Sequence, residues 1–157
     1  MNHPLKRHEA LKPLSKDHHH GLLLCWKIRE GKKRKIATDR IKAYTDFYFN
    51  SQLRPHFQFE EEEVFVLLGE DHPMVKHAKA EHQHLERLFK EERNIDRALD
   101  QIEKELEAHI RFEERVLFNE LQQEVSIEKL ENLKNREEEI KTPDPDQWDD
   151  KFWLSQE

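Results

Sequence analysis

One ten-residue pattern occurs twice in this chain. The segment HFQFEEEEVF, which begins at His56, returns as HIRFEERVLF, which begins at His109. In each copy the histidine precedes a glutamate, Glu60 or Glu113, by four residues. Residues four apart lie on the same face of an α-helix, so each copy offers an imidazole nitrogen and a carboxylate oxygen to one point. The repeat therefore predicts two helices that each carry a two-donor metal-binding unit, and facing units would enclose a pair of ions.

The composition favours a helical domain with a real core. The chain has 157 residues, which fits one domain, and 39% of them are charged. Nine Phe and three Trp fall at helical spacing with the other hydrophobic residues, which argues against disorder. Only three glycines occur, and Glu, Lys, Arg and Leu are abundant, so long helices are expected.

The charge and the cysteine content limit which binding partners and which cellular compartment are expected. The net charge of −7 comes from interspersed signs without a basic stripe, so nucleic acid is not an expected partner. No apolar run reaches the ~20 residues of a membrane span, and the polar N-terminus does not resemble a signal peptide. The single cysteine, Cys25, excludes an internal disulfide framework and fits a reducing compartment. We therefore expect a cytoplasmic protein without a membrane partner.

The hydrophobic spacing divides the chain into long helices joined by short connections. An irregular arm at residues 1–13 is expected to precede them. Helices are expected at about residues 15–29, 38–69, 73–92 and 94–123, with a shorter one at 126–141. Ser15 is a typical N-terminal cap, Gly31 suits a C-terminal cap, and Pro55 is expected to kink the second helix.

These elements predict an all-α fold, an antiparallel up-down-up-down four-helix bundle with a short C-terminal helix. The bundle domain is expected to cover residues 1–141. The acidic and aromatic tail at residues 142–157 contains two prolines and is expected to be extended. Three aromatic side chains, Trp148, Phe152 and Trp153, are expected to pin the tail to the bundle.

The other two long helices are expected to complete the metal site. His18 shares a helix face with the apolar Leu14 and Leu22, so it should point inward. His82 lies on an apolar line with Leu85 and should also point inward. The other histidines do not share such a clearly apolar helix face and are expected at the surface: His3, His8, His19, His20, His72, His77 and His84.

The predicted metal ligands are six inward side chains: His18, His56, Glu60, His82, His109 and Glu113. Four imidazoles and two carboxylates suit iron, manganese or zinc. The two glutamates can bridge two ions, and six side chains leave coordination positions for water, oxide or a small ligand. Glu61–Glu63 and Glu114 are expected at the surface, although Glu61 and Glu114 could replace the preceding glutamates if the helices rotate.

The order of a histidine, a His-x-x-x-Glu pair, a histidine and a second such pair resembles the hemerythrin-like, or HHE cation-binding, family. The motifs that carry the resemblance are LSKDH ending at His18, HFQFEE, EHQHL around His82 and HIRFEE, over about residues 14–121. The resemblance implies a four-helix bundle with two iron ions, bridged by two carboxylates and an oxo or hydroxo group.

The chain departs from the oxygen-carrying hemerythrins at two positions. Those proteins have a second histidine on the third helix, where this chain has Ala78. Their fourth-helix carboxylate follows its histidine by five residues, whereas Glu113 follows His109 by four. One ion is therefore expected to have a weaker ligand shell, which favours sensing or reactivity over reversible oxygen carriage.

The interpretation that combines these features is a non-haem di-iron protein for sensing or stress response. Its partner would be a small ligand: oxygen, nitric oxide or peroxide. Alternatives are an iron storage or delivery protein and a metal-free helical interaction module. A ferritin-like oxidase is disfavoured because only Glu81 and His84 have a suitable Glu-x-x-His spacing. No His-Glu-x-x-His motif or activated nucleophile occurs, so a binding protein is favoured over a classical enzyme.

Overall fold

The computed structural model describes residues 6–137 and 142–154, and all the regular structure in these ranges is helical. The prediction of an all-α chain is therefore confirmed. No helix in the two ranges is both long and apolar enough to cross a membrane. His3 and the last four residues of the predicted fifth helix, 138–141, lie outside the described residues.

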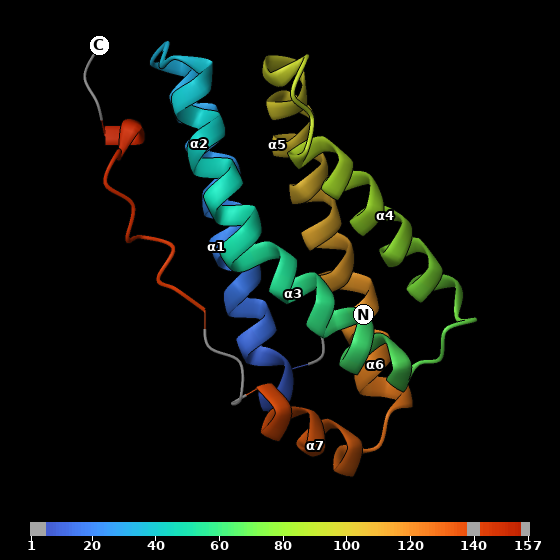
Figure 1. Ribbon diagram of the computed structural model, residues 1–157. Coiled ribbons are helices and arrows are strands. Elements are labelled where there is room, and N and C mark those ends of the chain that lie inside the picture. The colour runs from blue at the N-terminus through green and yellow to red at the C-terminus, as the bar shows by residue number, and fades with distance from the viewer. Residues whose placement is uncertain (1–5, 138–141, 155–157) are drawn as a thin grey trace.

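The helices follow the predicted segments closely (Figure 1). The α-helices are α1 (Lys12–Lys33), α2 (Thr38–Tyr48), α3 (Arg54–Phe59), α4 (Pro73–Phe89), α5 (Ile95–Phe112), α6 (Phe118–Glu124) and α7 (Ile127–Glu137). A π-helical turn connects α2 to α3, and another connects α5 to α6. A π-helical turn followed by a 3₁₀ turn extends α3, so the backbone stays helical through each of these segments. The predicted second and fourth helices are thus continuous rods that change their winding along their length.

The first helix begins earlier than the sequence analysis expected. A 3₁₀ turn at Glu9–Leu11 leads directly into α1, and the Nδ1 atom of His8 caps this turn by accepting from the amide of Ala10 at 3.0 Å. Most of the predicted irregular arm that the structure describes is therefore helical. Ser15 lies inside α1 instead of capping it, and its hydroxyl donates to the carboxylate of Glu114.

The end of α1 also differs from the prediction. Gly31 was expected to cap the helix, but it is buried inside the last turn, and Lys35 adopts the left-handed backbone with φ of 59°. A Cβ atom at Gly31 would lie 2.8 Å from both Ile41 Cδ1 and Phe152 Cε1. The glycine is therefore needed for close packing of α1 against α2 and the C-terminal tail.

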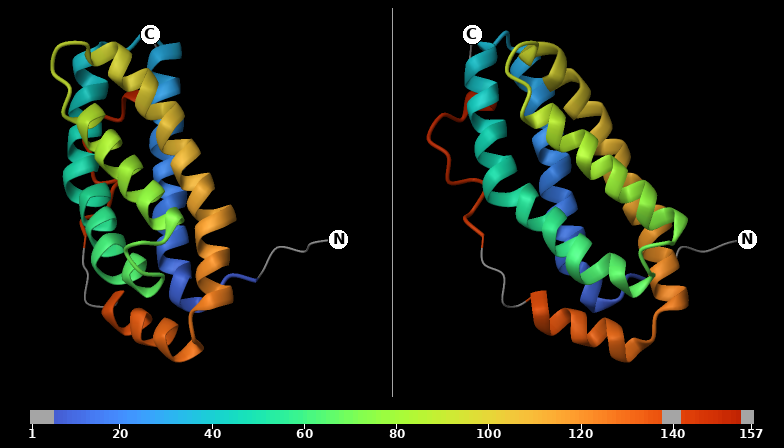
Figure 2. Two further views of the ribbon diagram at one scale, coloured as in Figure 1. Left: turned by 90° about the vertical axis from the view of Figure 1, so that its right-hand side faces the viewer. Right: turned by 45° about the vertical axis from the view of Figure 1, so that its right-hand side comes forward.

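The rod formed by α2 and α3 changes direction where the two helices meet (Figures 1 and 2). A π-helical turn at Phe49–Leu53 precedes the proline, and the amide of Arg54 donates to the carbonyl of Phe49. The proline then occupies the first turn of α3, where the ring and the missing N–H are tolerated. The predicted bend is thus achieved by a wide turn followed by proline.

The long rods lie side by side, and α7 crosses one end of them (Figures 1 and 2). Helix α1 packs most extensively against α5, and α5 also packs against α4. A Cβ atom at Gly21 of α1 would lie 2.7 Å from Cδ1 of Ile110 of α5, so this glycine permits the close approach. Helix α7 packs against the 3₁₀ turn that precedes α1.

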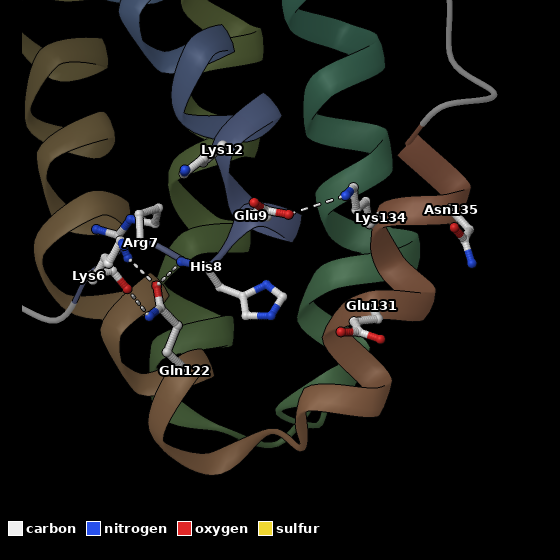
Figure 3. A pocket seen from close by; sticks show the side chains of 9 residues that line it. All are labelled: Lys6, Arg7, His8, Glu9, Lys12, Gln122, Glu131, Lys134 and Asn135. Carbon is white, nitrogen blue, oxygen red and sulfur yellow. Dashed lines mark hydrogen bonds and ion pairs between the residues drawn. The ribbon is translucent and has the colours of Figure 1, made fainter.

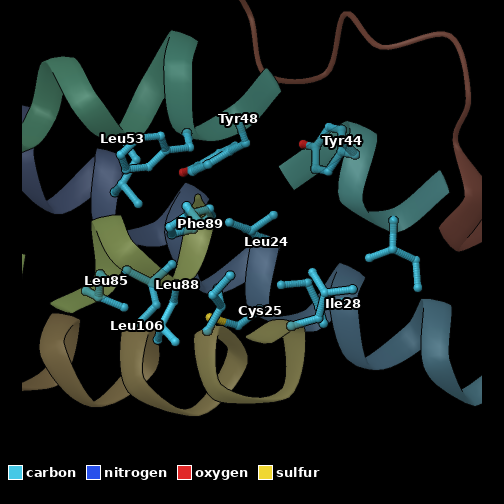
Figure 4. Close-up of a cluster of buried hydrophobic side chains, with 14 of the residues drawn as sticks. Leu24, Cys25, Ile28, Tyr44, Tyr48, Leu53, Leu85, Leu88, Phe89 and Leu106 are labelled. Carbon is cyan, nitrogen blue, oxygen red and sulfur yellow. The ribbon is translucent and has the colours of Figure 1, made fainter. Parts of the chain in front are cut away.

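Two apolar clusters form the core. The first lies toward the α1–α2 connection and includes Leu24, Cys25, Ile28, Tyr44, Tyr48, Leu53, Leu85, Leu88, Phe89 and Leu106 (Figure 4). The second lies toward α7 and includes Leu11, Leu14, Phe59, Phe65, Val75, Ala78, Leu117, Phe118 and Leu121. Buried polar side chains from the rods lie between the two clusters, as the position of His18 between Leu14 and Leu24 shows.

The C-terminal tail packs against α1 and α2, and a 3₁₀ turn at Phe152–Leu154 interrupts the extended chain that the sequence predicted. Phe152 is fully buried in the first core cluster, and Trp148 stacks on Phe47 with ring centroids 4.8 Å apart. The ammonium group of Lys27 lies over the ring of Trp153 at 4.0 Å, and a bidentate ion pair joins Arg40 to Asp150. These contacts confirm that the aromatic residues of the tail anchor it to the helices.

Candidate metal centre

The structure brings the six predicted ligands together in one buried layer. None is more than 6% exposed, and both glutamates are fully buried. Four rods supply them as single residues or pairs: His18 from α1, His82 from α4, and the pairs of the two repeats from α3 and α5 with the turns that follow. Burial of so many ionisable groups costs free energy unless they are paired or bind an ion.

The spacing of four residues in each repeat has the predicted result. His56 Nε2 lies 3.3 Å from Glu60 Oε1, and His109 Nε2 lies 3.4 Å from Glu113 Oε2. Each repeat therefore presents one nitrogen and one oxygen to the same point.

Both repeats also share a backbone feature that the sequence analysis missed. A π-helical turn begins at Glu60 in the first repeat and at Glu113 in the second. The amide of Phe65 donates to the carbonyl of Glu60, and the amide of Phe118 donates to the carbonyl of Glu113. Single π-helical turns occur often at functional sites, and here the two turns begin at equivalent candidate ligands.

The donors divide into two groups that share both glutamates. One group contains His18, His56, Glu60 and Glu113, and the other contains Glu60, His82, His109 and Glu113. Glu113 spans the groups, because its Oε1 atom lies 2.8 Å from His18 Nε2 and its Oε2 atom lies 3.4 Å from His109 Nε2. The arrangement has the form of two ion positions bridged by two carboxylates.

Distances within the groups suit donors that share an ion. The Nε2 atoms of His18 and His56 are 3.3 Å apart, and His82 Nε2 is 3.2 Å from Glu60 Oε1. Metal–nitrogen bonds are about 2.0–2.1 Å long, so two such donors at a tetrahedral angle would be about 3.3 Å apart. The site therefore fits transition-metal ions without a large movement of the side chains.

The expectation of one weaker ligand shell is wrong for this arrangement. Each donor group contains two histidines and the same two glutamates, so the two positions are balanced. Ala78, which replaces the additional histidine of oxygen-carrying hemerythrins, is fully buried in the second core cluster. It packs as a core residue, and neither donor group found within residues 6–137 and 142–154 contains a further histidine in its place.

A ring of four hydrogen bonds between helices orients the four imidazoles. In each bond a histidine Nδ1 atom donates to a carboxylate of a neighbouring rod. The pairs are His56 with Asp17 at 3.0 Å, His82 with Glu61 at 2.8 Å, His109 with Glu81 at 2.8 Å and His18 with Glu114 at 2.6 Å. Because every Nδ1 atom faces a carboxylate, every Nε2 atom faces the centre. Metal-binding histidines are characteristically held in this way.

Sequence reasoning missed all four of these carboxylates. Glu61 and Glu114 were expected at the surface, but they bond His82 and His18, and Asp17 and Glu81 were not considered as partners. Their positions in the sequence could have indicated these carboxylates, because each one directly precedes or follows a candidate ligand. A neighbouring residue is turned by about 100° on a helix, so it points toward the next rod.

Further side chains hold two of these carboxylates. Ser15 donates to both oxygens of Glu114 at 3.0 and 2.8 Å, and Arg7 lies 3.7 Å from the same carboxylate. His77 Nε2 lies 3.3 Å from Glu81, so this exposed histidine contacts the ring from outside. Among the other histidines expected at the surface, His84 is exposed and bonds Glu105.

The titration of the buried groups reflects their mutual charge. Burial alone would lower the pKa of His18, but hydrogen bonds to Glu113 and Glu114 outweigh burial and raise it to about 9. Burial likewise opposes the charge of His56, whose pKa rises to about 10 because of Glu60 and Asp17. A metal ion would replace the protons that these imidazoles otherwise hold.

Several central atoms are buried without a hydrogen-bond partner among the described residues. They are both carboxylate oxygens of Glu60, Oε2 of Glu113, and the Nε2 atoms of His82 and His109. Buried polar atoms without partners are rare in folded proteins. All of them face the two donor groups, so the residues present fit a pair of metal ions.

Aromatic rings cover the metal-facing histidines. Phe57 stacks on His82 with centroids 3.8 Å apart and an interplanar angle of 12°, and Phe65 lies 5.5 Å away from the same ring. Phe118 stacks on His18 at 5.3 Å. These rings exclude water and lower the local dielectric, which strengthens electrostatic interactions at the centre.

One sizeable hollow lies away from the candidate ligands. It has a volume of about 690 Å³ and lies between the N-terminal segment, α6 and α7 (Figure 3). Several of its charged groups already have partners: Lys134 pairs with Glu9 at 3.3 Å, and Arg7 donates to Gln122 at 3.0 Å. Its imidazole, His8, already caps the 3₁₀ turn, and none of the six candidate ligands lines this hollow.

Comparison with known proteins adds no relative: no family model, no curated protein and no solved structure matches this chain. The assignment below therefore rests on the geometry of the side chains.

Proposed function

We propose that this protein holds a pair of iron ions and binds or reacts with a small ligand. In this proposal the rods form a hemerythrin-like, antiparallel up-down-up-down four-helix bundle, and the six buried side chains are the ligands. The ring of imidazole–carboxylate hydrogen bonds is the observation that carries the proposal. It directs four Nε2 atoms from four rods toward two shared carboxylates, and a purely structural core has no need for that orientation.

The donor set favours iron and leaves positions for a ligand. Imidazole and carboxylate donors suit iron, with manganese and zinc as the alternatives. Each donor group contains two histidines and two shared glutamates, which is fewer donors than the six that an octahedral ion takes. A bound iron pair would supply oxidation-state change and open coordination positions for oxygen, peroxide or nitric oxide.

Two other interpretations receive less support. A storage or delivery protein needs ions that leave easily, whereas all six ligands are buried and four are held by interhelical hydrogen bonds. A metal-free helical module would leave Glu60 and Glu113 buried with unpartnered oxygens. We therefore propose a resident cofactor for sensing or a stress response.

Metal analysis after anaerobic loading with ferrous iron tests the proposal. We expect close to two iron ions per chain, and a spectrum in the near ultraviolet that changes when air is admitted. His82→Ala should lose at least one ion. The matched control is His84→Ala on the same helix, which should keep both, because His84 is exposed and bonds Glu105. Iron content near zero in folded, carefully loaded protein would exclude the proposal.

Slow release distinguishes a resident cofactor from a reservoir. A strong ferrous chelator should remove iron from the native protein slowly, because the ligands are buried in a packed layer. Release as fast as from an exposed surface site would favour storage or delivery instead.

A further inference from the structure

A cavity of about 130 Å³ lies beside one half of the candidate metal centre. Its walls come from α1, the π-helical turn before α3, α3 and the end of α7, and α7 lies below α1 and α3 in Figure 1. His56 lines the cavity together with Asp17, which accepts from His56 Nδ1 at 3.0 Å. The cavity therefore reaches a candidate ligand and its hydrogen-bond partner directly.

The other half of the centre is more closely covered. A hollow of about 350 Å³ also reaches His82, but Phe57 stacks face to face on that ring at 3.8 Å, and Phe65 lies 5.5 Å from it. Among the described residues no ring stacks in this way on His56, whose aromatic neighbours lie tilted or edge-on. Access to the centre is thus easier beside His56.

The wall of the cavity beside His56 contains an unsatisfied carboxyl group. Both side-chain oxygens of Glu137, the last residue of α7, are buried and have no hydrogen-bond partner within residues 6–137 and 142–154. Gln52 adds an amide to the same wall, and Leu14 and Phe59 make the remainder partly apolar. Buried polar groups of this kind require a polar partner. A guest that hydrogen-bonds is therefore favoured over an apolar one.

We propose that this cavity binds hydrogen peroxide, or a small polar molecule of the same class, and that Glu137 holds it by a hydrogen bond beside the His18–His56 half of the centre. The inference rests on the proposed function, because it names the ligand class and its route to the same site. Peroxide can both donate to and accept from a carboxyl group, so it satisfies Glu137 in either protonation state. At about 30 Å³ per water molecule, the cavity has room for one peroxide with a few waters.

Binding can be measured without any metal. In metal-free protein, NMR should show saturable shifts of the Gln52 side-chain amide and the Leu14 methyl groups as hydrogen peroxide is added. Leu106, which lies in the first core cluster outside the cavity, should not shift. Glu137→Leu should abolish the shifts, and Glu137→Gln, which retains hydrogen bonding, should keep them. Absence of any saturable shift in the unchanged protein would overturn the inference and leave the metal assignment untouched.

The iron-loaded protein supplies a second measurement. In this assay hydrogen peroxide is added to the ferrous protein, and the rate of iron oxidation is measured. Each of two ferrous ions loses one electron, the O–O bond of peroxide breaks, and two protons from solvent complete two water molecules. Glu137→Leu should slow this oxidation about ten-fold, the effect of losing one hydrogen bond, while the rate of nitric oxide binding stays within about two-fold. The matched control is Glu131→Leu, an exposed position on the same helix outside the cavity, and it should change neither rate.

Obstruction of the route is tested at another residue of the cavity lining. Gln52→Trp should fill the cavity and slow both peroxide oxidation and nitric oxide binding, whereas Gln83→Trp at the hollow beside His82 should slow neither. Slowing by Gln83→Trp alone would place access beside His82 and overturn the inference. An effect of Glu137→Leu on the rate of ferrous loading, with peroxide oxidation unchanged, would also overturn it and identify the cavity as a route for the metal.

Discussion

At the scale of single residues, orientation of the imidazoles is as important as their number. A histidine can coordinate through either ring nitrogen, and a free side chain samples several rotamers. The carboxylates of Asp17, Glu61, Glu81 and Glu114 each fix one ring by accepting from its Nδ1 atom. This hydrogen bond also makes the other nitrogen more basic and thus a stronger donor. Affinity should therefore depend on residues that do not touch the ion.

Substitution of one of these carboxylates tests that dependence. Glu61→Gln should weaken metal binding about 10–100-fold, the effect of losing such a partner, measured by competition with a chelator of known affinity. The control is Glu62→Gln, because Glu62 is exposed and accepts from Gln58 at 3.2 Å instead of from a candidate ligand. Equal affinities of the two variants would show that the hydrogen bond to His82 does not orient a ligand.

The sequence predicted the six inward donors but not their four partners. The donors follow from spacing within one helix, where residues four apart share a face. The partners depend on which rods are neighbours, because Asp17 of α1 bonds His56 of α3 and Glu114 returns to His18 of α1. Spacing along one helix contains no information about that neighbour.

Cys25 allows a prediction that is independent of metal. The thiol is fully buried in the first core cluster, and burial is the main cause that raises its pKa to about 12. Because the thiolate is the reactive form, the native protein should resist alkylation at pH 8, whereas urea-unfolded protein should react fully. Mass spectrometry of iodoacetamide-treated protein measures both. Rapid alkylation of the native protein would contradict the buried position of Cys25.

At the scale of elements, the π-helical turns are the feature of the structure that the hydrophobic spacing of the sequence did not predict. Helix positions were predicted within a few residues, because hydrophobic spacing follows a period of about 3.6. The π-helical turns at Glu60–Val64 and Glu113–Leu117 were not, since one additional residue in a turn hardly changes that pattern. The role of Gly31 was likewise not predictable from the sequence, because glycine suits both a helix end and a close helix contact.

The close contact at Gly31 can be tested by substitution. Gly31→Ala would place a methyl group 2.8 Å from side-chain atoms of Ile41 and Phe152, and both of these residues are buried in the core. The overpacking costs about 1–3 kcal/mol and exceeds the gain in helix propensity of about 1 kcal/mol, so the free energy of unfolding should fall. Urea denaturation measures the change. Lys33→Ala, an exposed control on α1, should leave the midpoint nearly unchanged, and a more stable Gly31→Ala protein would show that the tail packs loosely.

At the scale of the whole molecule, one polar layer divides the core. The two apolar clusters lie on either side of the six candidate ligands, so the stability of the fold depends on how the charge of that layer is balanced. Without metal, protonated imidazoles balance the carboxylates, as the raised pKa values of His18 and His56 and the strongly lowered pKa of Glu60 indicate. With metal, the ions replace those protons.

This exchange predicts opposite pH dependences for the two forms. The pKa values of His18 and His56 rise from about 6.5 in the unfolded chain to about 9 and about 10 in the metal-free fold. Groups with a raised folded pKa stabilise the fold fully below the unfolded pKa, and this contribution is lost as the pH rises through the folded values. Metal-free protein should therefore lose stability between about pH 6.5 and pH 10.

Metal binding should show the reverse trend, because each ion must displace protons that are held less firmly at higher pH. The increase in Tm caused by loading should be larger at pH 9 than at pH 6. Scanning calorimetry of metal-free and zinc-loaded protein at both pH values measures it without redox chemistry. The His84→Ala control should behave like the unchanged protein, since His84 is exposed and outside the layer. An increase in Tm that is the same at both pH values would mean that the ions do not replace protons on the buried imidazoles.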